Sequence, residues 1–495
     1  MSAATSTDRS RWIALVVLCT GMLMIILDSA IVNVALPPIQ SDLGFSQSNL
    51  TWVVNAYLIP FGGLLLLAGR VGDLIGRRTI FLVGLAVFTA ASLACGLAAS
   101  QEVLVGARLV QGAGGALTSS VILGIIVTMF TEPGERAKAI GVFSFVASAG
   151  ASIGLLAGGV LTQGIDWHWI FFVNVPIGIA TALLALRYVE RDEGIGLRAG
   201  ADVAGGALVT ASLMLGVYTI LETADYGWGS ARTLGLGALA LALLAAFIVR
   251  ESRTPNPLVP LGIFRSREIA GANAVQVLTV AGMFGMFFLG VLYLQRVLKY
   301  DALETGLAFL PVSTLIGILS LGFSARLTQR YGAAAVVLPG LALIAVGLLG
   351  FARAPVDGSY LTDLLPVMIP LGIGAGLFFP AVTTLAMSGV TPSQSGLASG
   401  LLNTSLQVGG SIGLAVLATL AATRTDNLAA DGTSTASALT GGYHFAFVIA
   451  AGLVVAAMLV TVAVLRRGRL RGAEQEAESR PIDFSGAEPA YSEAA

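Results

Sequence analysis

Fourteen long apolar runs constrain this chain more than any other feature of its sequence. Each has roughly the 20 residues that a helix needs to cross a bilayer. Charged residues make up only 11% of the chain, against roughly 25% in soluble domains. The runs are too long and too uniformly apolar for the alternating strands of a membrane barrel. They predict an all-α integral membrane protein with spans at residues 12–36, 50–69, 79–99, 103–129, 137–161, 168–187, 202–221, 233–249, 269–294, 304–324, 333–351, 363–388, 396–420 and 443–465.

The basic residues fall unevenly between the two sides that these spans define. With the N-terminus inside, most of the 27 basic residues lie in inside segments, as the positive-inside rule requires. This predicts cytoplasmic N- and C-termini and an even number of spans. The first run is too long for a signal-peptide core and contains Asp28, so we expect it to be a membrane helix. Abundant Ala and Gly with only two lysines hint at a bacterial plasma membrane.

The composition also excludes several classes of protein. The two cysteines and two histidines are scattered, so no metal site, cofactor site or disulfide framework is expected. A net charge of −1 gives no basic surface for nucleic acid. A membrane enzyme would need a cluster of His, Asp or Glu at a membrane face, and the sequence contains none. We expect a monomer in the bilayer that is not an enzyme.

The chain repeats itself weakly at an offset of about 256–260 residues. Residues 69–84 resemble residues 325–340, with Gly76 on Gly332 and Gly84 on Gly340. Two homologous six-helix bundles with two inserted helices explain this pattern, which is typical of transporters. The predicted organisation is a cytoplasmic N-terminus (1–11), a first bundle (12–190), a linker with two extra helices (191–267), a second bundle (268–466) and a disordered tail (467–495).

Asp28 lies well inside the first span, where a carboxylate is costly and usually marks an ion or proton pathway. Arg108 of the fourth span is the expected partner. Asp28 lies about 24 Å along its span, and Arg108 lies about 7–8 Å below the outer edge, so both belong to the outer half. A direct pair and a water-linked pair both fit, as does an arginine that reaches the outer interface. Gln111 is on the same helix face as Arg108.

Two glycine-containing segments suggest moving parts. The segment 69–78 reads as a short cytoplasmic loop, with Asp73 able to contact a helix N-terminus near 393–396 and close the inner side. The second is a small-residue stripe on the fifth span, which permits close helix approach. The predicted gating residues are Gly69, Arg70, Gly72, Asp73, Gly76, Arg77, Arg78, Gly150, Gly154, Gly158 and Gly159.

Several uncharged polar residues within the spans are candidates for the wall of a substrate cavity. Each could instead form a helix–helix hydrogen bond. They are Asn33, Asn55, Tyr57, Gln111, Asn174, Gln276, Tyr293, Gln295, Asn403 and Gln407.

Five motifs together resemble the major facilitator superfamily, in particular its fourteen-helix drug:proton antiporter branch. They are residues 27–37 (LDSAIVNVALP), 69–78, 104–115, 150–159 and 166–178. The resemblance implies two six-helix bundles around a central cavity that works by alternating access. It also implies that Asp28 and Arg108 act in proton coupling.

We therefore expect a proton-coupled exporter of lipophilic drug-like or antibiotic molecules. The alternative within the same class is a proton symporter that imports a small metabolite. A signalling membrane protein is a third interpretation, and it would tolerate Asp28→Asn.

Overall fold

The computed structural model describes residues 2–46, 49–194, 196, 202–255, 257–387 and 395–478. Within these ranges the chain is helical and contains no strand. Twelve of the described helices are long and apolar enough to cross a membrane, and two shorter apolar stretches are Ile153–Gly164 and Ala302–Ile318. All fourteen predicted runs fall on helices.

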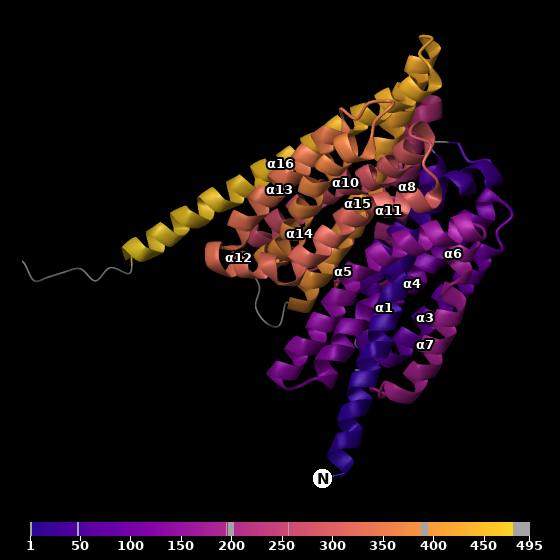
Figure 1. Cartoon of the computed structure of the whole chain (residues 1–495). Helices are drawn as coiled ribbons and strands as arrows, with labels where there is room; N and C mark the ends of the chain where they lie inside the picture. The colour runs from indigo at the N-terminus through magenta and orange to yellow at the C-terminus, as the bar shows by residue number, and fades with distance from the viewer. Residues whose placement is uncertain are drawn as a thin grey trace, which may run out of the picture.

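The first half of the chain packs as one group of helices (Figure 1). Its buried faces are built largely from aliphatic residues and small residues. Its helices are α1 (Ser2–Leu43), α2 (Trp52–Ile75), α3 (Arg77–Gly96), α4 (Gln101–Met129), α5 (Pro133–Gly164), α6 (Trp169–Phe172) and α7 (Asn174–Tyr188), with a 3-10 turn, η1 (Asn49–Thr51).

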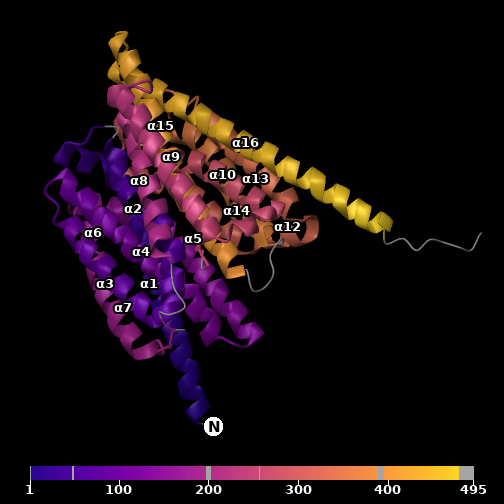
Figure 2. The same cartoon turned by 180° about the vertical axis from the view of Figure 1, so that it is seen from behind.

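The second half forms the other group, seen from behind in Figure 2. Its helices are α10 (Arg267–Leu292), α11 (Ala302–Ile318), α12 (Ser324–Tyr331), α13 (Ala333–Phe351), α14 (Leu365–Met387), α15 (Ser395–Ala430) and α16 (Thr435–Glu478). Three π-helical segments adjoin them: η4 (Tyr293–Val297), η5 (Leu319–Phe323) and η6 (Tyr360–Leu364). A 3-10 turn, η3 (Leu261–Arg265), precedes α10.

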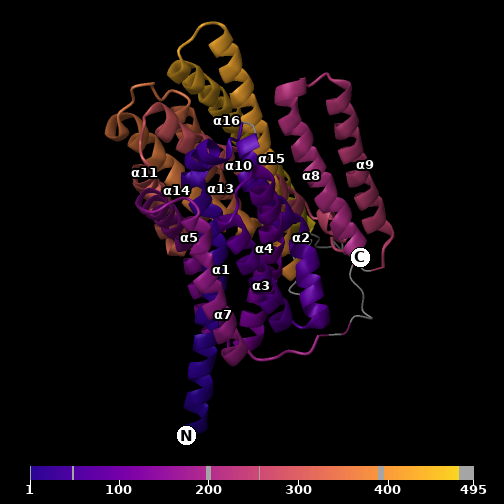
Figure 3. The same cartoon turned by 90° about the vertical axis from the view of Figure 1, so that its right-hand side faces the viewer.

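Helices α8 (Val203–Tyr226) and α9 (Ala231–Arg253) form a hairpin on the outside of the bundle (Figure 3). Helix α8 packs against α2 of the first group and α15 of the second. Thr210 of α8 lies against Gly63 of α2, and Thr419 of α15 donates a hydrogen bond to the Ile220 carbonyl (3.5 Å). The inserted hairpin therefore lies across the seam between the two groups.

The equivalence predicted for Gly76 and Gly332 is visible in the backbone. Each ends one helix and begins the next, with φ of 114° at Gly76 and 88° at Gly332. Glycine adopts such positive φ values without the steric cost of a side chain. The same one-residue turn thus occurs at matching positions of the two groups.

Three expectations differ in detail from the structure. The run 168–187 is divided at Val173 into α6 and α7. Residues 467–478, expected to be disordered, continue α16 to Glu478, because this stretch is rich in Arg, Ala, Glu and Gln, which favour helix. The third difference concerns residues 69–78, which are mostly helical rather than a loop.

Candidate functional site

Asp28 and Arg108 are in direct contact inside the first group of helices. Arg108 Nη1 lies 2.5 Å from Asp28 Oδ2, and both side chains are fully buried. A buried charge of either sign is tolerated only when it is paired and hydrogen-bonded. The direct pair, one of the arrangements open from sequence, is the one found here.

Three neutral side chains from other helices complete the network around Asp28. Its Oδ1 atom accepts hydrogen bonds from Gln111 Nε2 (2.8 Å) and Asn174 Nδ2 (2.9 Å). Gln111 also donates to Ser92 Oγ (2.8 Å). Helices α1, α4 and α7 therefore meet at one carboxylate, and α3 joins them through Gln111.

Arg108 is held in place by groups other than Asp28. Its Nε donates to the Val53 carbonyl (2.9 Å), and its Nη1 also reaches Gln111 Oε1 (2.7 Å). The guanidinium carbon lies 4.4 Å from the centre of the Tyr57 ring and 5.6 Å from that of Phe171. Stacking on aromatic faces favours a cation in such a position.

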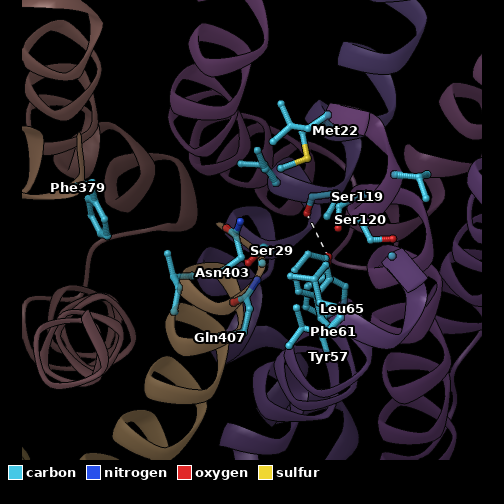
Figure 4. A pocket seen from close by; sticks show the side chains of 18 of the residues that line it. Met22, Ser29, Tyr57, Phe61, Leu65, Ser119, Ser120, Phe379, Asn403 and Gln407 are labelled. Carbon is cyan, nitrogen blue, oxygen red and sulfur yellow. Dashed lines mark hydrogen bonds between the residues drawn. The ribbon is translucent and has the colours of Figure 1, made fainter. Parts of the chain in front are cut away.

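A cavity of about 1250 Å³ lies between the two groups of helices (Figure 4). Its wall is largely apolar and aromatic, as in Met22, Phe61 and Phe287. Neutral polar groups interrupt this wall, among them Ser29 on α1 and Asn403 and Gln407 on α15, which Figure 4 shows close to one another. Tyr57 lies between the two sites: it lines the cavity, and its ring also stacks on the Arg108 guanidinium.

The cavity reaches one end of the bundle, which we call the basic end: the end where α1 and α3 begin and α9 ends. The charged residues of its wall, Arg70, Asp73 and Arg77, belong to the junction of α2 and α3 at this end. At the opposite end the two groups meet. There Gln295 of the second group donates a hydrogen bond to the Val34 carbonyl of α1 (3.0 Å).

The segment 69–78 is a helix end rather than a loop. Residues 69–75 complete α2, Gly76 alone makes the turn, and Arg77 begins α3. Two contacts stabilise this arrangement. Asp73 pairs with Arg77 one turn later (3.0 Å), and the distant Asp192 carboxylate accepts from the Arg77 and Arg78 backbone N–H groups (2.7 and 3.0 Å). A carboxylate is stabilised by the positive end of a helix.

Further contacts of this segment also stay within the first group. Arg77 reaches the Gly124 carbonyl of α4 (3.2 Å), and Arg78 reaches the Leu186 carbonyl of α7 (2.5 Å). A side chain on Gly72 would meet Val121 at 2.4 Å, and one on Gly69 would meet Ser120 at 3.8 Å. The partner predicted for Asp73 near 393–396 lies outside the described residues.

The glycines of α5 lie against α1 beside Asp28. A Cβ atom on Gly154 would be 2.9 Å from the Leu27 carbonyl, and one on Gly158 would be 2.8 Å from the Ile31 carbonyl. Gly150 faces Ile26 in the same way, whereas Gly159 faces Ala302 of α11 in the other group.

The polar candidates separate into several sets. Those in the cavity wall are Asn33, Tyr57, Asn403 and Gln407. Gln111 and Asn174 belong instead to the Asp28 network, and Asn55 and Gln276 are buried outside the wall. Gln295 closes the far end, and Tyr293 donates to the Pro355 carbonyl (2.5 Å). Each of these polar residues has apolar neighbours along its helix, so the sequence does not indicate which of them face the cavity.

Ser92 and Asp192 are site residues that sequence reasoning missed. Ser92 sits in an apolar run with nothing to mark it, and Asp192 lies far along the chain from the turn that it caps. In the part of the chain that the structure describes, no three His, Cys, Asp or Glu side chains gather in a way that could hold a metal ion.

Comparison with known proteins decides the family. The model of the Major Facilitator Superfamily matches residues 18–414. The chain belongs to the major facilitator superfamily. It is 40% identical to the puromycin resistance protein of Streptomyces alboniger over 93% of this chain and 92% of that protein. It is 36% identical to the cephamycin export protein of Amycolatopsis lactamdurans over 86% of this chain and 88% of that protein.

A solved structure shares the fold of this superfamily member. A bacterial homologue of the human lysosomal transporter Spinster, in an inward-facing and unoccupied conformation, superposes with a TM-score of 0.65 at 18% identity. The match covers 92% of this chain and 97% of that one. At this identity the likeness supports the fold alone.

Proposed function

We propose that this superfamily member exports lipophilic antibiotic-like molecules in exchange for protons. The observation that carries the proposal is a fully buried Asp28–Arg108 pair directly behind the wall of a large, mostly apolar cavity. An ionisable group inside a membrane bundle is by default a candidate functional site, and proton relays are among the known uses of such groups. The resistance and export names of the two relatives support the direction and the class of substrate.

The cavity wall supports a substrate of limited polarity. Its charged groups all belong to the basic end, while the deeper wall offers hydroxyl and amide groups from Ser29, Asn33, Asn403 and Gln407. A neutral or singly charged amphiphile matches this wall, whereas a dication would find no buried carboxylate among its described residues. The volume of about 1250 Å³ exceeds that of pockets for typical drug-sized ligands, about 300–1,000 Å³.

Helix α1 supplies the connection between proton and substrate. Within residues 28–34 it carries the proton site Asp28, the wall residues Ser29 and Asn33, and the Val34 carbonyl that receives Gln295 from the other group. Protonation of Asp28 removes the negative partner of Arg108 and changes the bonds of Gln111 and Asn174. We propose that protonation from the far end weakens the substrate site, and that α1 then shifts against the α5 glycines and closes that end, so that the proton is released at the basic end.

This mechanism requires that proton and substrate disfavour each other. A ligand shifts a two-state equilibrium only by its differential affinity for the two states, and the coupling is reciprocal. We assign the basic end to the cytoplasm, so that the described conformation takes substrate from inside.

We further propose that the full membrane span count is fourteen. Helix α5 has 32 residues, and α11 continues through η5 into α12, so both are long enough to cross. The two six-helix bundles then comprise 12–190 and 268–466, in a bacterial plasma membrane.

Direction of transport is the experiment that tests the proposed function. Inverted membrane vesicles that contain the protein are energised so that their lumen becomes acidic, and uptake of puromycin as probe is followed. We expect accumulation that collapses with a protonophore. Vesicles that instead lose preloaded probe on energisation would establish the symporter, and the absence of any proton-dependent flux would leave a non-transporting membrane protein.

A further inference from the structure

Two buried acids meet at the basic end of the inserted hairpin, far from the Asp28 network. Asp202 precedes the first turn of α8, and Glu251 belongs to the last turn of α9; each residue is only 3% exposed. A Cβ atom on Gly205 would be 2.6 Å from Asp202 Oδ2 and 2.9 Å from Glu251 Oε1. The two carboxyl groups therefore converge over a glycine that leaves room for both.

The converging oxygens are the ones that lack a donor. Within the described part of the chain, neither Asp202 Oδ2 nor Glu251 Oε1 has a hydrogen-bond partner, and both are out of contact with solvent. Two ionised carboxylates cannot share such a site, because like charges at close range disfavour one of the two charged forms. A proton held between Oδ2 and Oε1 satisfies both atoms at once.

The remaining contacts indicate which acid carries that proton. Asp202 Oδ1 accepts from Arg250 Nε (2.6 Å) and from the Gly205 backbone N–H (2.9 Å). A cation and a helix N-terminus both stabilise the charged form. Within the described residues no ion pair joins Glu251 to a cation; its carboxylate accepts from the Leu258 and Val259 backbone N–H groups, the latter bond to Oε2 at 2.8 Å. These contacts favour Glu251 as the acid that would hold a proton at this site.

Glu251 also ties the hairpin to the cavity. Val259 belongs to a strap, residues 257–260, in which Pro257, Leu258 and Pro260 line the basic end of the cavity. The strap has no titratable side chain, and α2 presents the apolar Leu66 and Leu67 to it. Among the described residues, Arg250 is the cation bonded to the pair, through Asp202, and Glu251 connects the strap to α9.

We propose that Asp202 and Glu251 share one proton and form a second proton site, which fastens the strap to the inserted hairpin. Loss of the proton places two negative charges over Gly205 and drives Glu251 away from α8. The strap, bonded to Glu251, moves with it at the mouth of the cavity. The site goes beyond the proposed exchange mechanism, since it responds to the pH on the basic side without substrate and without Asp28.

Infrared spectroscopy of the purified full chain tests the shared proton. Asp28 is another buried acid of the described residues that could give such a signal, so the experiment is done in Asp28→Asn. The carbonyl band of a protonated carboxyl group is recorded in this variant at neutral pH. We expect a band that persists in Asp28→Asn and is lost when Glu251→Gln is added. Glu222→Gln, at the other end of the same hairpin where Glu222 pairs with Arg232 (2.8 Å), should leave it unchanged. An identical band in the variants with and without Glu251→Gln would overturn the proposal.

Accessibility of the strap tests its coupling to that proton. Leu258→Cys places a thiol on the strap, where the native side chain is 8% exposed, and the native Cys19 and Cys95 are buried. The rate of labelling by an impermeant maleimide is measured at each pH for Leu258→Cys alone and for Leu258→Cys combined with Glu251→Gln. The ratio of the two rates is used, because the titration of the thiol itself affects both variants equally. We expect the ratio of rates to rise severalfold from mildly acidic to alkaline pH. A constant ratio, or one that follows sodium instead of pH, would contradict a shared proton.

Discussion

At the scale of single residues, the Asp28–Arg108 pair is held by geometry that leaves little freedom. Arg108 contacts a carboxylate, an amide oxygen, a backbone carbonyl and an aromatic face at once. Only a planar guanidinium offers donors in so many directions, and lysine does not. Removing either member of the pair alone is therefore expected to lower the stability of the protein.

The single variant Arg108→Gln is predicted to be less stable than the double variant Arg108→Gln with Asp28→Asn. Removal of one member of a buried pair costs about 3–5 kcal/mol, because an uncompensated charge remains. Thermal unfolding of the purified protein should show a large loss for Arg108→Gln and a partial recovery in the double variant. A double variant no more stable than Arg108→Gln would mean that the two charges are not coupled.

The residues of this network were predictable only where their chemistry is rare. An acid inside an apolar run is conspicuous, and the rise per residue of a helix placed Arg108 at a matching depth. Ser92 is an ordinary hydroxyl in an apolar helix, and its role depends on how α3 is rotated toward α4. Packing decides that rotation, and the composition of α3 does not encode it.

At the scale of helices, the contact between α1 and α5 determines how closely the two backbones approach each other beside Asp28. Gly154 places backbone against backbone, since its missing side chain would meet the Leu27 carbonyl and the Ala30 side chain at 2.9 Å. The position of α1 therefore depends on the absence of a side chain on α5.

Gly154→Leu is predicted to abolish proton-coupled flux and to destabilise the bundle by about 1–3 kcal/mol through overpacking. Gly164→Leu is the matched control on the same helix, because nothing lies within 4 Å of its Cβ position. Flux and thermal unfolding are measured for both variants in liposomes. Equal behaviour of the two variants would show that the close approach of α1 and α5 is unimportant.

Helix positions were largely predictable, and helix irregularities were not. Span length and apolarity are strong signals, so the predicted runs fall on helical segments, although the runs 168–187 and 304–324 are each divided between segments. Span length and apolarity carry no signal for the break at Val173 or for the π-helical segment η5. The one-residue turn at Gly76 depends on Asp192, which lies more than a hundred residues along the chain.

At the scale of the whole molecule, the cavity is accessible from the basic end and the two groups close at the other. The bond from Gln295 to the Val34 carbonyl joins the groups at the closed end. A net hydrogen bond contributes about 1 kcal/mol, so its loss should shift the balance of open and closed states about fivefold.

Gln295→Leu is therefore predicted to favour the outward-open state. Labelling of Ser29→Cys by an impermeant reagent should rise from the outside and fall from the inside. Gln101→Leu is the control, because its amide donates to the Leu43 carbonyl (3.0 Å) within the first group. Equal labelling of the two variants from either side would contradict this description of the closed end.

The central claim is that protonation of Asp28 is exchanged for substrate. The most direct test reconstitutes the protein in liposomes that contain a pH dye and adds puromycin as probe, for the native chain, Asp28→Asn and Asp42→Asn. Asp42 is an exposed acid of the same helix. We predict probe-triggered proton movement in the native chain and in Asp42→Asn, and none in Asp28→Asn. Proton movement that survives in Asp28→Asn, or probe flux without any proton movement, would contradict the account.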